Sequence, residues 1–132
     1  KAFDTVSHDH ILVGLKQKGV EQHIINLIKN MYDNVHTCLD NKKEKSEPIQ
    51  MWVEVKQGDP MSPLLFSLAI DPLLCKLQEC GKGYKYENNL IRAMAFADDI
   101  VLLSDSWQGM QFNIKILENF CELTSLKTQG EK

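Results

Sequence analysis

The sequence predicts an α+β domain in which helices pack on one face of an antiparallel sheet. The apolar period changes twice from that of a helix to that of a strand and back, and Gly and Pro residues separate the segments. The predicted order is helix, helix, hairpin, helix, hairpin, helix. With 132 residues, 43% of them hydrophobic, the chain is predicted to be one domain or a large part of one.

Two helices are predicted in the first quarter of the chain. Residues 7–18 favour a helix that Ser7 caps and Gly19 ends, and residues 21–32 favour a second. In each, apolar residues recur at helical spacing, as on a face that packs against a core. These residues are Ile11, Leu12 and Leu15 in the first helix and Ile24, Ile25, Leu27, Ile28 and Met31 in the second.

A hairpin and a long helix follow. Residues 35–39 and 49–56 alternate apolar and polar side chains, which predicts two strands joined by the polar loop 40–48. The dipeptide Ser62-Pro63 predicts a helix start with Ser62 as the N-cap. Pro72 is expected to kink this helix or to mark a boundary near Asp71.

The last third predicts a second hairpin and a final helix. Residues 84–87 and 90–104 are typical of strands, and the acidic pair Asp98-Asp99 interrupts the second. Residues 106–123 predict an amphipathic helix. Its expected apolar face contains Met110, Ile114, Leu117 and Cys121.

Composition excludes several classes of protein. The net charge of −3 argues against a domain whose whole role is to coat nucleic-acid phosphates. No apolar run approaches the roughly 20 residues that span a bilayer, and the first residues have no signal-peptide pattern, so no membrane partner is expected. The four cysteines lack metal-ligand spacing and are predicted to be reduced, partly buried thiols.

The pair Asp98-Asp99 is the sharpest chemical feature, because it lies inside an apolar, strand-forming run. At the tip of a buried hairpin the two carboxylates would repel each other unless a cation neutralised them. Ligands that offer only oxygen favour Mg²⁺ or Mn²⁺. The alternative is an ordinary solvent-exposed turn, where Asp is common.

A second feature is the loop that contains Gln57 and Gly58, before the helix start at Ser62. Glycine lets a backbone approach a ligand closely, and the positive end of the helix would face this loop. The alternative is a plain strand-to-helix connection. The opening segment around Phe3 and Asp4 predicts only a short strand that enters a helix.

Together the segments KAFDTVSHDHI, VKQGDPMSPLLFSLAIDPLL and AFADDIVLLS resemble motifs A, B and C of reverse transcriptases, in the form found in non-LTR, LINE-type (type-1) retrotransposons. The resemblance covers nearly the whole chain. It implies a reverse-transcriptase palm with incomplete fingers and no thumb, so that residues 1–132 would be a partial domain, truncated at both ends. Ser125 stands where the family more commonly has glycine, near motif D, and Glu54 also replaces a common glycine.

The resemblance also implies roles for individual residues. Asp98 would be a catalytic metal ligand and Asp99 its supporting carboxylate, with Mg²⁺ or Mn²⁺ as the cofactor. Gln57 and Gly58 would lie along the incoming nucleotide and template, and Phe3 would block a ribose 2′-hydroxyl, or simply pack in the core. The metal-binding aspartate of motif A would precede Lys1. Asp4 would then have a bracing role.

The implied activity is RNA-directed DNA polymerisation by a larger Pol polyprotein that commonly also carries an endonuclease. Its partners would be an RNA template, a DNA primer or target, deoxynucleoside triphosphates (dNTPs) and the missing parts of its own polyprotein. The expected location is intracellular, in the nucleus at the site of integration, and the chain alone is expected to be inactive. Two alternatives remain: a domesticated, non-catalytic RNA-binding module, and a polymerase of the group II intron or telomerase type.

Overall fold

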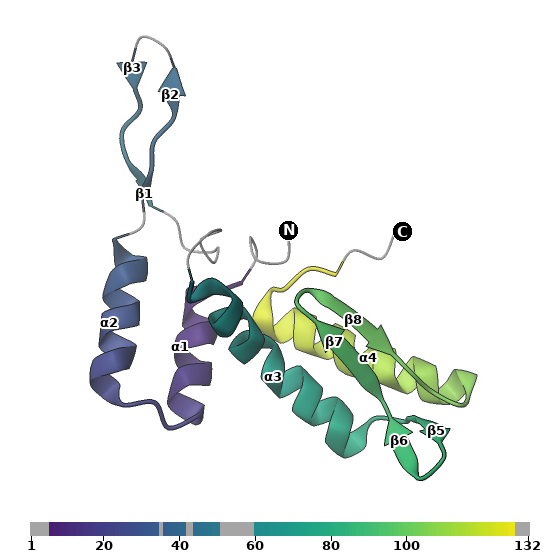
Figure 1. The fold of residues 1–132 in the computed structure, drawn as a ribbon. Coiled ribbons are helices and arrows are strands. Elements are labelled where there is room, and N and C mark those ends of the chain that lie inside the picture. Colours follow the sequence, from purple (N-terminus) through teal and green to yellow (C-terminus); the bar gives the residue numbers. More distant parts are fainter. Residues whose placement is uncertain (1–5, 35, 42–43, 51–59, 129–132) are drawn as a thin grey trace.

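The computed structural model describes residues 6–34, 36–41, 44–50 and 60–128. Along this part of the chain two helices precede a hairpin region, a third helix, a second hairpin region and a last helix, as the sequence predicts, but each hairpin region contains two antiparallel ladders (Figure 1). The helices are α1 (His8–Gln17), α2 (Gln22–Asp33), α3 (Ser62–Cys80) and α4 (Trp107–Thr124). The strands are β1 (His36–Thr37), β2 (Asp40–Asn41), β3 (Glu44–Lys45), β4 (Ile49–Gln50), β5 (Tyr84–Tyr86), β6 (Asn89–Ile91), β7 (Ala93–Phe96) and β8 (Asp99–Leu102).

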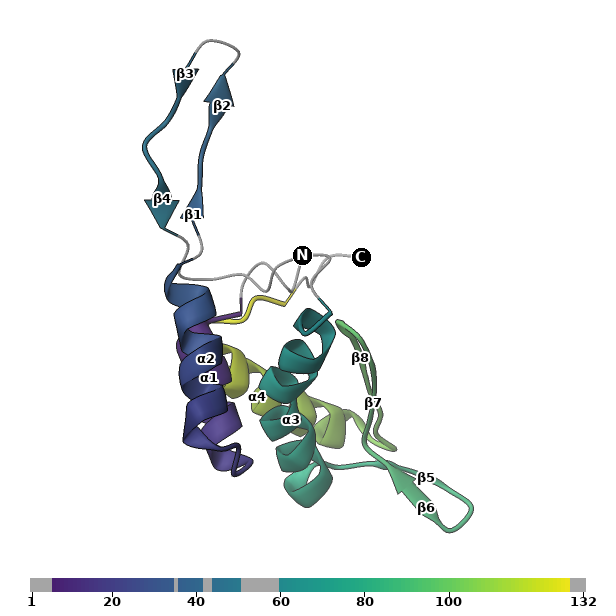
Figure 2. The same cartoon turned by 60° about the vertical axis from the view of Figure 1, so that its left-hand side comes forward.

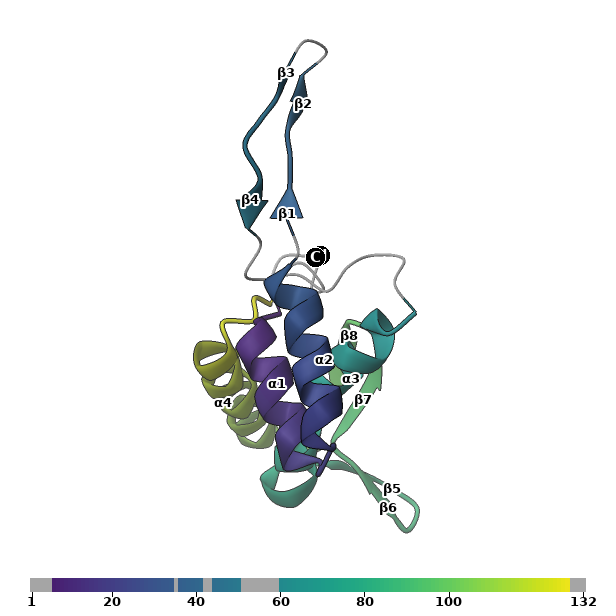
Figure 3. The same cartoon turned by 90° about the vertical axis from the view of Figure 1, so that its left-hand side faces the viewer.

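The core lies where α1, α2 and the first half of α3 meet. Ile11 and Leu15 of α1 are buried, as the sequence predicts, against Phe66 and Ala69 of α3. Figure 3 shows α1 and α2 side by side in front of α3. On α2 fewer apolar residues are buried than predicted, because Ile25 and Ile28 are buried whereas three apolar neighbours are exposed. These are Ile24, Leu27 and Met31.

Helix α3 continues through Pro72 without the boundary expected near Asp71. Proline has no N–H, so a helical carbonyl one turn earlier loses its donor. In the same turn His10 Nε2 donates to the carbonyl oxygen of Ala69 across 2.8 Å, and Gly14 lies against Leu68. The turn of α3 that precedes Pro72 is therefore packed against α1, and this packing supports a continuous helix. The helix begins at Ser62 itself, with Met61 as the N-cap, one residue earlier than predicted.

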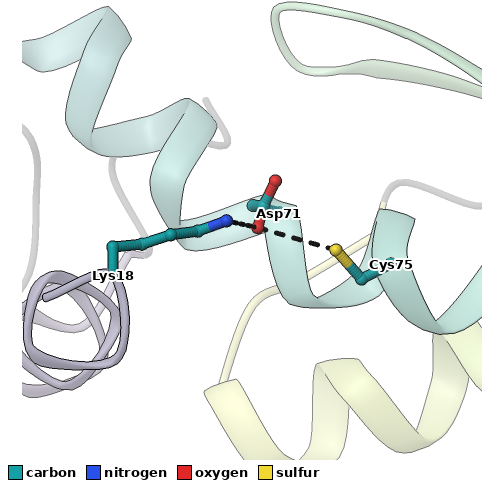
Figure 4. A network of polar contacts seen from close by, with 3 residues as sticks. All are labelled: Lys18, Asp71 and Cys75. Carbon is teal, nitrogen blue, oxygen red and sulfur yellow. Dashed lines mark hydrogen bonds and ion pairs between the residues drawn. The ribbon is translucent and has the colours of Figure 1, made fainter.

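A charged contact also joins α1 to α3. Lys18 Nζ lies 2.5 Å from Asp71 Oδ2, and the same oxygen accepts a hydrogen bond from the Cys75 thiol (Figure 4). The hydrogen bond to Asp71 and its negative charge raise the pKa of Lys18. The contact is partly exposed, so it contributes little to stability.

The predicted single sheet is wrong for the described residues, whose strands form separate two-stranded ladders. These ladders pair β1 with β4, β2 with β3, β5 with β6 and β7 with β8. The first two ladders project away from the helices (Figures 1 and 2). They therefore lie too far from β7 and β8 to share a sheet with them. The segment 40–48, predicted as a loop, contains β2 and β3, whereas residues 51–56 of the predicted strand lie outside the described residues.

The segment predicted as one strand from 90 to 104 is divided into β6, β7 and β8. β6 pairs back onto β5, and only β7 and β8 flank the acidic pair. Gly83 allows this arrangement, because a β-carbon there would come within 2.7 Å of Leu90 Cγ. No described helix is long and apolar enough to cross a membrane.

The four cysteines are free, as predicted, but less buried than expected. Cys38, Cys75 and Cys80 are exposed, and Cys121 is half-buried in α4. Desolvation raises the pKa of the Cys121 thiol. Cys121 is therefore the one cysteine of the four that is partly shielded from solvent.

Candidate active site

The acidic pair lies at the tip of the β7–β8 hairpin. Phe96 pairs with Asp99, so Ala97 and Asp98 form a two-residue turn between the strands. Both carboxylates are exposed. The prediction of a buried tip is therefore wrong. Water can solvate the two charges, so a cation is not required to neutralise them. The geometry agrees with the exposed turn that was the alternative, and it leaves both carboxylates open to a ligand.

The turn is held in an unusual backbone conformation. Ala97 has a φ of +50°, in the left-handed region that residues with a β-carbon rarely adopt. Two-residue hairpins need a positive φ at the first central position, which normally selects Gly, Asn or Asp. An alanine there stores strain of the kind that is concentrated at functional sites. The strained residue directly precedes Asp98.

The two faces of the hairpin have different environments. Ala93 and Leu102 pair across the ladder, as do Ala95 and Ile100, and Ile100 packs against the helical core. The opposite face is open to solvent, since 85% of Phe96 is exposed, and Met94 and Val101 are also exposed. β7 contacts α3, and β8 contacts α4. The helices therefore support one face of the hairpin and leave the other free.

The tip lies on the side of the molecule where α3 begins and α4 ends (Figures 1 and 2). The predicted ligand residues Gln57 and Gly58 precede α3 in the chain, and they lie outside the described residues, as do Phe3 and Asp4. The structure therefore tests neither their position nor their role. Lys127, which follows α4, is exposed.

An open cavity of about 390 Å³ lies between α3 and β7, away from the acidic pair. Its lining mixes apolar side chains with a thiol, an amide and a guanidinium. The lining residues are Leu74, Cys75, Leu77, Gln78, Arg92, Ala93 and Ala95. Neither carboxylate lines the cavity, so a ligand of the pair would approach it at the exposed tip and not through this cavity.

The acidic pair fits a magnesium ion that is shared with a substrate. Among the described residues no three His, Cys, Asp or Glu side chains come together, so the pair would supply at most two protein ligands. Mg²⁺ is commonly bound by one or two carboxylates together with water and substrate phosphates. Two adjacent, accessible carboxylates could provide the protein part of such a site.

The structure also reveals a residue that the sequence reading missed. Asn113 in the middle of α4 is completely buried, whereas Ile114, predicted for the inner face, is 37% exposed. Asn113 Nδ2 donates to the carbonyl oxygens of Lys82 and Leu103, and its Oδ1 accepts from the Lys82 N–H. Helix α4 is thus rotated about its axis, relative to the predicted orientation, so that the amide of Asn113 faces the interior. The available signal was the glycine one turn earlier, Gly109, which is also buried.

Comparison with known proteins agrees with the resemblance of the three motifs. The family described as reverse transcriptase (RNA-dependent DNA polymerase) matches residues 1–132. The Drosophila melanogaster protein named "Retrovirus-related Pol polyprotein from type-2 retrotransposable element R2DM" is 36% identical over 132 residues, which are 100% of this chain and 12% of that protein.

Two further relatives match most or all of the chain. The Nasonia vitripennis Pol polyprotein from type-1 retrotransposable element R2 is 39% identical over 89% of this chain and 11% of that protein. A Xenopus laevis protein named for transposon TX1 is 30% identical over 100% of this chain and 10% of that protein. The chain thus spans about a tenth of the length of these relatives. The family match covers the motifs from end to end, and so the chain belongs to the reverse transcriptase family.

Proposed function

We propose that this chain is the palm portion of an RNA-directed DNA polymerase within a retrotransposon Pol protein. The observation that carries the proposal is the accessible Asp98-Asp99 pair, held on a hairpin tip in a chain of the reverse transcriptase family. The reaction would transfer a nucleotide from a dNTP to the 3′-hydroxyl of a primer on an RNA template.

In this proposal the hairpin presents negative charge where the primer end and the triphosphate meet. Asp98, in the turn, is the proposed metal ligand, and Asp99, the first residue of β8, is the supporting carboxylate. A bound Mg²⁺ or Mn²⁺ would neutralise phosphate charge and activate the primer hydroxyl. Gln57 and Gly58 are proposed to contact the incoming nucleotide and template, and Phe3 to exclude a ribose 2′-hydroxyl.

The proposed partners follow from this reaction. They are an RNA template, a DNA primer or target, dNTPs and the other parts of the Pol protein, which in this family commonly include an endonuclease. The proposed location is the nucleus, at the site of integration. The chain on its own is expected to extend no primer, because the motif A aspartate is proposed to precede Lys1.

The test is primer extension on an RNA template by the protein encoded in the full reading frame that contains this chain. Wild type is compared with Asp98→Asn, which keeps the size of the side chain and removes its charge. Electrostatic stabilisation by a metal site is worth several kcal/mol, so the variant should be slower by more than about a hundredfold. Asp105→Asn is the matched control, because Asp105 is an exposed aspartate beyond the end of β8.

Each outcome decides between the proposal and its alternatives. Mg²⁺-dependent extension that Asp98→Asn abolishes and Asp105→Asn preserves supports the polymerase. An Asp98→Asn variant as active as wild type would remove Asp98 from the site. An inactive wild type that binds RNA tightly would favour the non-catalytic RNA-binding module.

A further inference from the structure

A closed polar network fixes the base of the β7–β8 hairpin to the helices. Asn113 on α4 is 0% exposed, and its amide nitrogen lies 2.6 Å from the carbonyl oxygen of Lys82 and 3.2 Å from that of Leu103. The Lys82 N–H donates to Asn113 Oδ1 across 2.8 Å. One side chain therefore satisfies three backbone groups in two segments that lie far apart in the sequence.

The same network includes both strands of the hairpin. The Leu103 N–H, just after β8, donates across 2.9 Å to the carbonyl of Arg92, just before β7. Arg92 Nε in turn donates across 3.1 Å to the carbonyl of Gly81, just after α3. Arg92 thereby joins one end of the hairpin base to Gly81, and Asn113 joins the other end, at Leu103, to Lys82 and to α4.

The close packing around this network leaves it little freedom. A β-carbon at Gly81 would lie 3.2 Å from Asn113 Oδ1, and one at Gly109 would lie 2.9 Å from Lys82 Cβ. Glycine at these two positions lets the end of α3 approach α4 closely enough for the amide to reach the backbone. Few other side chains of similar size could make these bonds, because an aspartate lacks the donors and a leucine lacks all polar atoms.

The position of the hairpin base determines the position of the acidic pair. Leu103 follows Asp99 by only four positions, roughly 13 Å along an extended chain. Among the described strands β7 and β8 pair only with each other, and their outer face is exposed. The direction in which the tip points therefore depends on the helix-facing side and on the polar network at the base.

We propose that Asn113 is a positioning residue for the Asp98-Asp99 pair, acting through Leu103 and Lys82 at the base of the hairpin. This inference rests on the proposed polymerase function. Asn113 does not touch substrate or metal in this proposal. Its role is to keep the hairpin tip at one fixed place, so that the carboxylates meet the metal and the triphosphate without reorganisation.

The test uses the protein of the full reading frame and the variant Asn113→Asp, which keeps the acceptor for the Lys82 N–H and loses both donated hydrogen bonds. We expect kcat to fall about tenfold and the Mg²⁺ concentration for half-maximal rate to rise, while the KM for primer-template stays unchanged. Asn119→Asp is the matched control, since it makes the same change at an exposed position of the same helix.

Hydrogen exchange supplies a readout that does not depend on activity. In Asn113→Asp, peptides covering β8 and Leu103 should exchange faster than in wild type and in Asn119→Asp. Because a buried charge can prevent folding, Arg92→Gln is the second variant. It removes the hydrogen bond to Gly81 at a half-buried position and should cause smaller shifts of the same kind.

The outcomes separate this inference from the proposed function. If Asp98→Asn is inactive while Asn113→Asp and Arg92→Gln keep the wild-type kcat and Mg²⁺ requirement, the positioning role is overturned, even where β8 exchanges faster. If Asp98→Asn is as active as wild type, the proposed function fails first. A raised Mg²⁺ requirement together with faster exchange of β8, in a folded variant, supports the proposal.

Discussion

The left-handed backbone at Ala97 predicts that Ala97→Gly stabilises the protein. Ala97 has a φ of +50° in the turn between β7 and β8. A β-carbon in this region costs about 1–2 kcal/mol, and glycine avoids that cost. Glycine in turn loses about 0.5–1 kcal/mol more through the freedom of the unfolded chain. The difference predicts a gain in unfolding free energy of about 0.5–1 kcal/mol.

Ala95→Gly is the matched control, because Ala95 lies in the same hairpin, inside β7 and opposite Ile100. With no strain to relieve there, the substitution should cost about 0.5–1 kcal/mol. Urea unfolding followed by circular dichroism measures both variants, and an unchanged slope shows that the change is one of stability. If the two substitutions destabilise equally, Ala97 is not held in a left-handed conformation and the reasoning is refuted.

Three further predictions concern stability and thiol reactivity. Gly19→Ala should lower the free energy of unfolding by about 1 kcal/mol, because Gly19 has a φ of +74°. Gly14→Ala should raise it by about 0.5–1 kcal/mol, because a methyl group fits at this position inside α1. Thermal unfolding that shows a change of the same sign for both variants would contradict this prediction. Ser125→Gly should raise the free energy of unfolding in urea by about 1 kcal/mol, since Ser125 has a φ of +59° at the C-cap of α4. A lower free energy of unfolding would refute the left-handed conformation of Ser125. Cys121 should react with iodoacetamide at pH 8 more slowly than exposed Cys80, because its raised pKa leaves less thiolate; peptide mass spectrometry should show equal rates only in the unfolded protein.

The helices could be predicted because their apolar residues recur at a regular period. α1, α2 and α4 agree with the predicted ranges to within one or two residues, and the buried positions Ile11 and Leu15 were identified. Of the two outcomes expected at Pro72, a kink or a boundary, the boundary is wrong, because the rule for proline is local. The contact of α1 with the same turn of α3, including the hydrogen bond from His10, is formed by residues about 60 positions away and leaves no local pattern.

The sheet was predicted less well for a related physical reason. Strand pairing depends on which segments meet in space, and the alternation of residues 35–39 and 49–56 shows only that each segment has two faces. The pair Asp98-Asp99 was identified from its place in an apolar run, but its exposure was only the alternative to the buried tip that was expected. Asn113 was missed because its hydrogen bonds form only when residues 82, 103 and 113 come together in the fold.

Ala97 and Ser125 share a strained conformation, but the strain has different consequences at the two positions. Ser125 lies at the C-cap of α4, in a different segment from the β7–β8 turn, so relieving its strain should leave the acidic pair undisturbed. Ala97 directly precedes Asp98, and its β-carbon narrows the range of φ and ψ at position 97, which set the direction in which the chain enters Asp98. Glycine at position 97 would therefore stabilise the turn and widen the range of positions of the carboxylate. We expect both variants to unfold at higher urea concentration but only Ala97→Gly to extend primers more slowly, and equal rates would mean that the strain at Ala97 does not serve the site.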